Sequence, residues 1–168
     1  MNTAQTSLLL AYAAVLGGWV MGVQIVTTPS VPVGLYRTHR AQTEEIAPGT
    51  FVCVRPLSDY APRQLRETVR EHGLPDTWIK VVAGVPGDVV SRSLMPDHLE
   101  INGTTLQNSV VLPADSEGRA LSAPVYPVVI PPDHVWLSSL HPLGYDSRYF
   151  GTVDMRAVSC VAVPLWTL

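Results

Sequence analysis

WIKVVAGVPGDVVSR, residues 78–92, consists of two short apolar runs that a Pro-Gly pair separates. Valine and isoleucine dominate both runs, as is typical of strands, and proline followed by glycine favours a turn. Similar runs, TFVCV at 50–54 and HLEING at 98–103, also lie between Pro and Gly breaks. The sequence therefore predicts a mainly β domain with strands and hairpin turns.

One short helix is expected within this β domain. APRQLRETVREHG, residues 61–73, places Leu65 and Val69 four positions apart among charged residues and ends in glycine. This is the pattern of an amphipathic helix with a glycine stop. Its charged residues are interpreted as a solvated face and are given no chemistry.

The C-terminal half predicts further strands after an irregular segment. Residues 108–126 have little periodicity and are expected to form an excursion between strands. VYPVVIPPDHVWLSSL (125–140) returns to strand-like composition, and TVDMRAVSCVAVPLW (152–166) predicts a last pair of strands.

Composition narrows the class of protein. The 168 residues carry a net charge of -3 with 46% hydrophobic residues, which fits one compact domain plus one extra segment and gives no basic excess for a nucleic-acid partner. The two cysteines, Cys53 and Cys160, have no metal-ligand spacing, so no metal is expected. They either form a disulfide outside the cytoplasm or stay as two buried thiols.

A membrane segment precedes the β domain. SLLLAYAAVLGGWVMGVQIV, residues 7–26, has no formal charge and is long enough to span a bilayer as a helix. We therefore expect an anchor over 1–26 and a catalytic domain over 27–168. A cleavable secretory signal is the alternative, but no convincing cleavage site follows the apolar run. Arg37 and Arg40, just beyond it, would by the positive-inside rule place the domain in the cytoplasm.

The stretch TTPSVPVGLY, residues 27–36, sets a serine on a stiff backbone. Pro29 and Pro32 flank Ser30 and exclude a helix there. Such a mount suits a nucleophile, and it equally suits an ordinary loop after an anchor. Gly34 is expected to let the chain turn away without a Cβ in a substrate cleft.

Lys80 is the only lysine of the chain and lies in the middle of an expected strand. Alternation places it on the same face as Trp78 and Val82. If that face is buried, desolvation lowers the pKa of the amine, as a lysine general base requires. The alternative is an edge-strand lysine that points at solvent and blocks aggregation.

A neutral lysine can activate a serine hydroxyl without histidine. The rival Ser-His-Asp arrangement cannot be excluded by residue order, although the G-x-S-x-G pattern is absent. The histidines available to it are His39, His72, His98, His134 and His141.

Three ordered segments together resemble the type I signal peptidase family of Ser-Lys proteases. They are SVPVGLY at 30–36, KVVAGVPGD at 80–88 and DSRYFG at 146–151. Within that family they look most like the conjugative-transfer branch (TraF type), whose serine segment reads S-x-P-x-G-x-Y. The resemblance implies a signal-peptidase-like (LexA-like) β-fold catalytic domain behind an N-terminal transmembrane helix.

The resemblance also implies roles for individual residues. Ser30 matches the nucleophile and Lys80 the general base. The oxyanion hole of the family uses the backbone N–H of the nucleophile and a hydroxyl two residues earlier, which falls on Thr28. Asp146 and Arg148 match a structural ion pair below the active site, with Ser147 between them.

One position departs from the family pattern. General signal peptidases carry a serine two residues before the D-S-R aspartate, where it hydrogen-bonds the catalytic lysine, and this chain has Gly144 there. Lys80 would then be oriented by another group, with Asp146, Ser138 and Ser139 as candidates.

The function implied by the resemblance is that of a membrane-anchored serine endopeptidase without a cofactor. It would be a single-pass protein of the bacterial cytoplasmic membrane with its catalytic domain on the periplasmic side. Its substrate would be an exported precursor, namely a conjugative pilin propeptide, which is released by water or by cyclisation. Two alternatives remain: a non-catalytic anchored β-domain that serves as an assembly or chaperone subunit, and a cytoplasmic self-cleaving repressor-like domain, for which no DNA-binding module is left in the chain.

Overall fold

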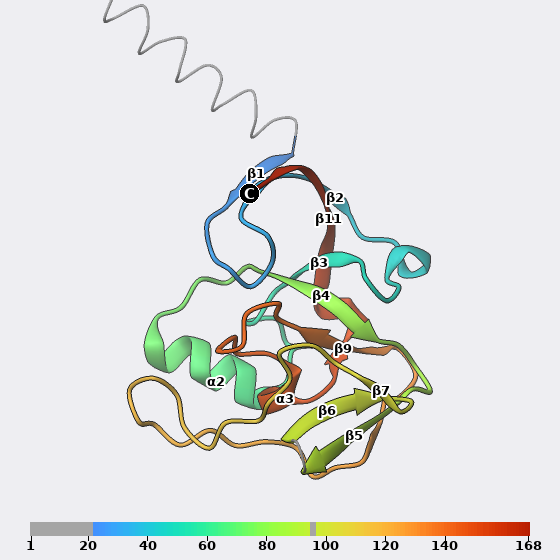
Figure 1. Ribbon diagram of the computed structural model, residues 1–168. Coiled ribbons are helices and arrows are strands. Elements are labelled where there is room, and N and C mark those ends of the chain that lie inside the picture. Colours follow the sequence, from blue (N-terminus) through green and yellow to red (C-terminus); the bar gives the residue numbers. More distant parts are fainter. Residues whose placement is uncertain (1–21, 95–96) are drawn as a thin grey trace, which may run out of the picture.

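The computed structural model describes residues 22–94 and 97–168, and most of its regular structure is β (Figure 1). The strands are β1 (Val23–Val26), β2 (Gly34–Arg40), β3 (Phe51–Val54), β4 (Trp78–Gly84), β5 (Val89–Leu94), β6 (Asp97–Ile101), β7 (Thr104–Thr105), β8 (Val128–Val129), β9 (His134–Ser138), β10 (Val153–Asp154) and β11 (Val158–Thr167). The helices are α2 (Arg63–His72), α3 (Ser147–Phe150) and the 3₁₀ turns η1 (Thr43–Glu45) and η2 (Met155–Ala157). The prediction of a mainly β domain is confirmed.

These strands form two antiparallel sheets within the described ranges. The larger sheet has the order β1-β2-β11-β3-β4-β9-β10, and the smaller has the order β7-β6-β5-β8. β11 pairs with β2 on one side and with β3 on the other, so the C-terminal strand lies inside the larger sheet. The larger sheet contributes to all three clusters of buried apolar side chains, and the smaller sheet packs on the one that includes Trp136 of β9.

The two runs of WIKVVAGVPGDVVSR do not form the hairpin that their spacing suggests. β4 pairs with β3 and β9, whereas β5 pairs with β6 and β8, so the turn between them carries the chain from one sheet to the other. The Asp88 side chain closes this turn by accepting a hydrogen bond from the Val85 N–H at 2.9 Å. A true hairpin follows β6, where Asn102 and Gly103 both have positive φ, as a two-residue turn requires.

The predicted helix is confirmed as α2. Leu65 and Val69 are buried and pack in the same cluster as Val52 and Val54 of β3. Gly73 ends the helix with φ +59°, and its N–H donates to the Val69 carbonyl. This left-handed conformation explains why the stop is a glycine.

The C-terminal segment differs from the prediction of a last pair of strands. Between residues 152 and 166 the structure has the two-residue β10, the turn η2 and one long strand, β11. Asp154 causes the break, because its side chain accepts a hydrogen bond from the Arg156 N–H at 2.8 Å and thereby caps η2. The expected count of one helix is also too low, since α3 forms one helical turn at the D-S-R segment.

Most of the expected membrane anchor lies outside the described residues. Its last four residues, Val23–Val26, form β1 rather than helix, because they pair along their whole length with β2. In the described ranges, no helix has the length and apolarity needed to cross a membrane.

The structure settles the cysteines and corrects the role of Gly34. Cys53 and Cys160 lie opposite each other in β3 and β11, with their Cα atoms 4.9 Å apart, and form a disulfide. A Cβ at Gly34 would overlap the backbone of Trp166 in β11. Glycine is therefore required here by the close approach of β11, and not by a substrate cleft.

Candidate active site

Ser30 lies in the turn between β1 and β2, and its carbonyl is hydrogen-bonded to the loop that follows β9. The Ser30 carbonyl accepts hydrogen bonds from the Leu140 N–H at 2.8 Å and from the Ser139 hydroxyl at 3.5 Å. The next residue, Val31, is buried. Two residues on, the Pro32 carbonyl accepts a hydrogen bond from the Tyr36 hydroxyl at 2.6 Å. The turn is thus fixed at the Ser30 carbonyl and over the two residues that follow it.

Lys80 projects from the centre of β4 toward this turn. Its Nζ donates a hydrogen bond to Ser30 Oγ at 3.2 Å, and its side chain is only 3% exposed. The ring of Trp78, two residues earlier on the same face, has its centroid 5.5 Å from Nζ. The expectation of a buried lysine beside Trp78 is confirmed, and the alternative of a solvent-facing lysine is wrong.

The surroundings of Lys80 change its protonation. Burial lowers the pKa of the amine from its ordinary value of 10.5 to about 8, because the charged form loses its hydration. The Asp146 carboxylate acts in the opposite direction, and the Arg148 guanidinium acts together with burial. A sizeable fraction of the amine is therefore neutral near pH 8, and a neutral amine can accept a proton.

Ser30 and Lys80 open into one cleft of about 720 Å³. One wall consists of residues 24–30, from β1 and the turn, and the other comes from residues 74–80 and 141–145. Thr28 is exposed on the first wall, two residues before Ser30. Among the five histidines, His141 is the one that lines this cleft. The structure thus brings Ser30, Lys80 and Thr28 together along one surface.

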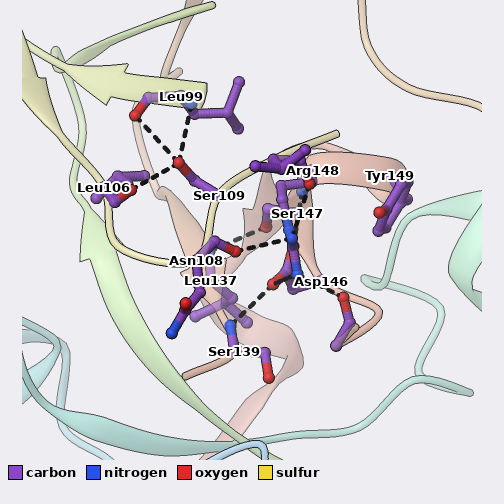
Figure 2. A network of polar contacts seen from close by, with 12 residues as sticks. Leu99, Leu106, Asn108, Ser109, Leu137, Ser139, Asp146, Ser147, Arg148 and Tyr149 are labelled. Atoms are coloured by element: carbon purple, nitrogen blue, oxygen red, sulfur yellow. Dashed lines mark hydrogen bonds and ion pairs between the residues drawn. The ribbon is translucent and has the colours of Figure 1, made fainter. Parts of the chain in front are cut away.

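Asp146 and Arg148 form a buried ion pair, and Figure 2 shows its contacts with Ser139 and Asn108. Arg148 Nε lies 2.8 Å from Asp146 Oδ1, and the Arg148 N–H donates to the same oxygen at 3.0 Å. The other carboxylate oxygen accepts a hydrogen bond from the Ser139 N–H at 2.9 Å. The ion pair is thus two hydrogen bonds away from Ser30, through Ser139 and the Ser30 carbonyl.

The guanidinium of Arg148 also holds two loops together beside the site. It donates hydrogen bonds to the carbonyls of Asn108, Val110, Pro142 and Gly144 at 2.7 to 3.0 Å. Ser147 lies between the paired residues, and its Oγ accepts a hydrogen bond from the Leu137 N–H at 2.9 Å. The D-S-R segment therefore positions the walls of the cleft, and all three of its side chains are buried.

The side chain of Ser139 fills the space that a side chain at position 144 would occupy. A Cβ placed on Gly144 would overlap both Cβ and Oγ of Ser139. The Ser139 hydroxyl accepts a hydrogen bond from the His141 N–H at 3.1 Å and lies 3.5 Å from the Ser30 carbonyl. A hydroxyl is therefore present beside the turn of Ser30, although it comes from position 139 and not from 144.

Several residues of the site were not predicted from the sequence. Leu140 and Tyr36 hold the turn of Ser30 through contacts made only in the fold. Tyr145 lines the cleft, and its ring packs edge-on against Trp78 with centroids 6.3 Å apart. The one sequence signal that could have indicated Tyr145 is its position directly after Gly144.

Comparison with known proteins agrees with the resemblance to signal peptidases. The family model described as "Signal peptidase, peptidase S26" matches residues 3–166. Two proteins called "Conjugal transfer protein TraF" are each 34% identical to this chain. The one from Agrobacterium tumefaciens (strain 15955) aligns over 94% of this chain and 88% of its own length, and the one from Agrobacterium fabrum (strain C58 / ATCC 33970) over 95% and 90%.

Among solved structures, a signal peptidase I from Enterococcus faecalis V583 is 17% identical, with a TM-score of 0.41. The alignment covers 73% of this chain and 98% of that chain. The family match spans nearly the whole sequence and includes all three segments on which the resemblance was based. The chain therefore belongs to the S26 signal peptidase family and resembles its conjugal transfer members.

Proposed function

We propose that this chain is a membrane-anchored serine endopeptidase in which Ser30 is the nucleophile and Lys80 the general base. The observation that carries the proposal is the 3.2 Å contact between Lys80 Nζ and Ser30 Oγ in a cleft wall where the lysine is buried. A lysine that served only as a solubilising charge would face water.

The reaction would proceed through an acyl-enzyme. Neutral Lys80 takes the proton of the Ser30 hydroxyl while Oγ attacks the carbonyl carbon of the scissile bond. The Ser30 N–H and the Thr28 hydroxyl donate hydrogen bonds to the resulting oxyanion. The tetrahedral intermediate then collapses, the C–N bond breaks, and the protonated Lys80 returns its proton to the leaving amine. Water, or an amine of the substrate itself, releases the acyl group from Ser30.

The periplasmic side of the cytoplasmic membrane is the proposed location. The apolar residues 7–26 are long enough for one membrane span. The disulfide between Cys53 and Cys160 supports an oxidising compartment such as the periplasm. Arg37 and Arg40 argue for the opposite orientation by the positive-inside rule, and we give the disulfide more weight because such bonds are rare in the cytoplasm.

An exported pilin precursor is the proposed substrate, since the relatives are conjugal transfer proteins. In this proposal an extended segment of the precursor adds to the strands at the cleft, and small side chains next to the cut fit beside Ser30.

Mass spectrometry of the precursor tests this function. The chain is co-expressed with a pilin precursor from the same transfer system, and intact masses are compared with those from a Ser30→Ala strain. We expect a shortened product only with wild-type protein: hydrolysis leaves a linear chain, and cyclisation gives a product one water lighter. Ser93→Ala, which changes a serine of β5 in the other sheet, should process normally. Normal processing by Ser30→Ala would contradict the proposal and favour an assembly or chaperone subunit.

The pH dependence of processing follows from the pKa of Lys80. Only the neutral amine accepts a proton, so kcat/KM should rise with pH through an apparent pKa of about 8. The neutral fraction grows from about one-tenth at pH 7 to about half at pH 8, which predicts a rise of about fivefold. Initial rates on a purified precursor measure it, and a profile that is flat from pH 6 to pH 9 would exclude Lys80 as the base.

A further inference from the structure

A second cavity of about 650 Å³ adjoins the active-site cleft. One wall is the outer face of α2, with Gln64 and Thr68, and the other is the segment 112–122. We call this cavity the side pocket. It lies in the region where the long loop after β7 passes beside α2 (Figure 1).

The side pocket and the cleft are neighbours that share part of their lining. Leu74, Leu143 and Tyr145 line both. The Tyr145 ring stacks on that of Tyr149, with centroids 5.4 Å apart and planes 5° from parallel, and packs edge-on against Trp78. Because Trp78 also lies beside Lys80 Nζ, an aromatic surface runs from the dyad into the side pocket.

The outer wall is built as a small rigid unit. Asp115 accepts hydrogen bonds from Arg119 through both the backbone N–H and Nε, and Ala114 pairs with Ala120 in an isolated bridge. Arg119 also reaches across to His72 on α2, with 3.5 Å between their nitrogens. A wall fixed in this way offers a preformed site, which lowers the entropic cost of binding.

The lining indicates what kind of group the pocket takes. Tyr145 and Tyr149 form its floor, and leucines, including Leu112 and Leu121, add apolar surface. The charges of Asp115 and Arg119 neutralise each other at the outer wall. The α2 wall adds polar groups, including Gln64, Glu71 and His72, so the apolar surface is concentrated around the tyrosines and leucines. A large apolar or aromatic side chain fits there, and the Glu71 carboxylate disfavours an acidic group.

We propose that the side pocket binds an apolar or aromatic side chain of the polypeptide substrate, several residues from the scissile bond. The proposal rests on the proposed function and adds a recognition site beyond the immediate surroundings of the cut. The residues that the side pocket shares with the cleft, Leu74, Leu143 and Tyr145, assign it to a substrate side chain that reaches beyond the cleft itself. Specificity then depends on a longer stretch of precursor than the cleft alone could contact.

Blocking the pocket tests the proposal. Ser122→Trp and Ala120→Trp each add a bulky ring at an exposed lining position. Val125→Trp is the matched control, because Val125 is 91% exposed on the same segment and does not line the pocket. Two fluorescent peptides copied from the cleavage site of the pilin precursor are compared: a short one that covers only the residues next to the cut, and a long one that extends through both ends of the cleft.

Binding is measured by fluorescence anisotropy in a Ser30→Ala background, so that the result does not require cleavage. We expect the long peptide to bind at least tenfold more tightly than the short one, as burial of one large apolar side chain predicts. Both blocking variants should remove this advantage, and the control should keep it. Equal binding of the two peptides, or an advantage that survives both blocking variants, would overturn the inference, whereas failure of the proposed function would appear separately as absence of cleavage by wild-type protein.

Discussion

Replacing Lys80 with methionine is expected to abolish precursor processing and at the same time to make the protein harder to unfold. Methionine has a similar length and no charge, so the buried space stays filled while the general base is lost. Removal of a catalytic base that acts with its nucleophile as a unit typically lowers kcat by about 10⁴-fold or more. Processing rates of the purified variant measure this effect.

The gain in stability follows from the pKa of Lys80. This pKa falls from 10.5 in the unfolded chain to about 8 in the fold, and each tenfold change in a protonation constant is worth about 1.4 kcal/mol. Keeping the amine charged inside the fold therefore costs roughly 3 kcal/mol. Methionine avoids that cost, and denaturant titration should show a larger free energy of unfolding.

The sign of the pH effect can be checked in the same experiment. Below pH 8 both the folded and the unfolded wild-type chains hold the Lys80 proton, so the full cost applies. Between pH 8 and 10.5 the unfolded chain binds more protons, and the stability of the wild type rises with pH. The advantage of Lys80→Met should therefore be largest below pH 8 and shrink above it.

Lys80→Arg is the matched control, because arginine keeps the charge and stays protonated. It should lose processing without gaining stability. If arginine supported processing, the role of Lys80 would be that of a fixed charge, and the general-base assignment would be wrong.

Replacing Arg148 with methionine should cause the largest loss of stability. The change leaves the Asp146 carboxylate buried without its cation, and it removes the donors of four loop carbonyls. Breaking one side of a buried ion pair typically costs about 3–5 kcal/mol, which is a large part of the stability of a small domain. We expect a strongly lowered melting temperature and poor recovery of folded protein.

Arg156→Met provides the comparison for this variant. Arg156 also pairs with an aspartate two residues earlier, Asp154, but its side chain is 66% exposed. Water can replace the lost partner there, so the melting temperature should fall far less. Equal losses in the two variants would show that burial of the Asp146–Arg148 pair does not determine its importance.

The local parts of the fold were predictable because each depends on a short pattern. The helix over 63–72 has its apolar residues four apart and a glycine at its end. β3 and β4 are apolar runs between turn residues. The only lysine of the chain lies in the middle of the second run, and this position indicated Lys80 as a candidate for the site. The pairing of strands was not predictable, since the break after β4 looks the same whether the chain turns back or moves to a second sheet.

Contacts between distant segments explain the other differences. Cys53 and Cys160 are 107 positions apart, and only the register of β3 against β11 makes them neighbours. Gly34 lies against the backbone of Trp166 and Thr167 for the same reason, because β11 pairs with β2. The hydrogen bond from Leu140 to the Ser30 carbonyl joins two loops whose sequences give no sign of each other.

Positions 139 and 144 can only be changed together, because a side chain at 144 would overlap that of Ser139. An engineer who introduces serine at 144, to imitate the general signal peptidases, has to replace Ser139 by glycine in the same step, because the two side chains would overlap. A motif search that scores each column separately would register a missing hydroxyl at 144 in this chain. The hydroxyl that occupies this place in space belongs to Ser139, five residues earlier along the same loop, and its hydrogen bonds run to the Ser30 carbonyl and from the His141 N–H.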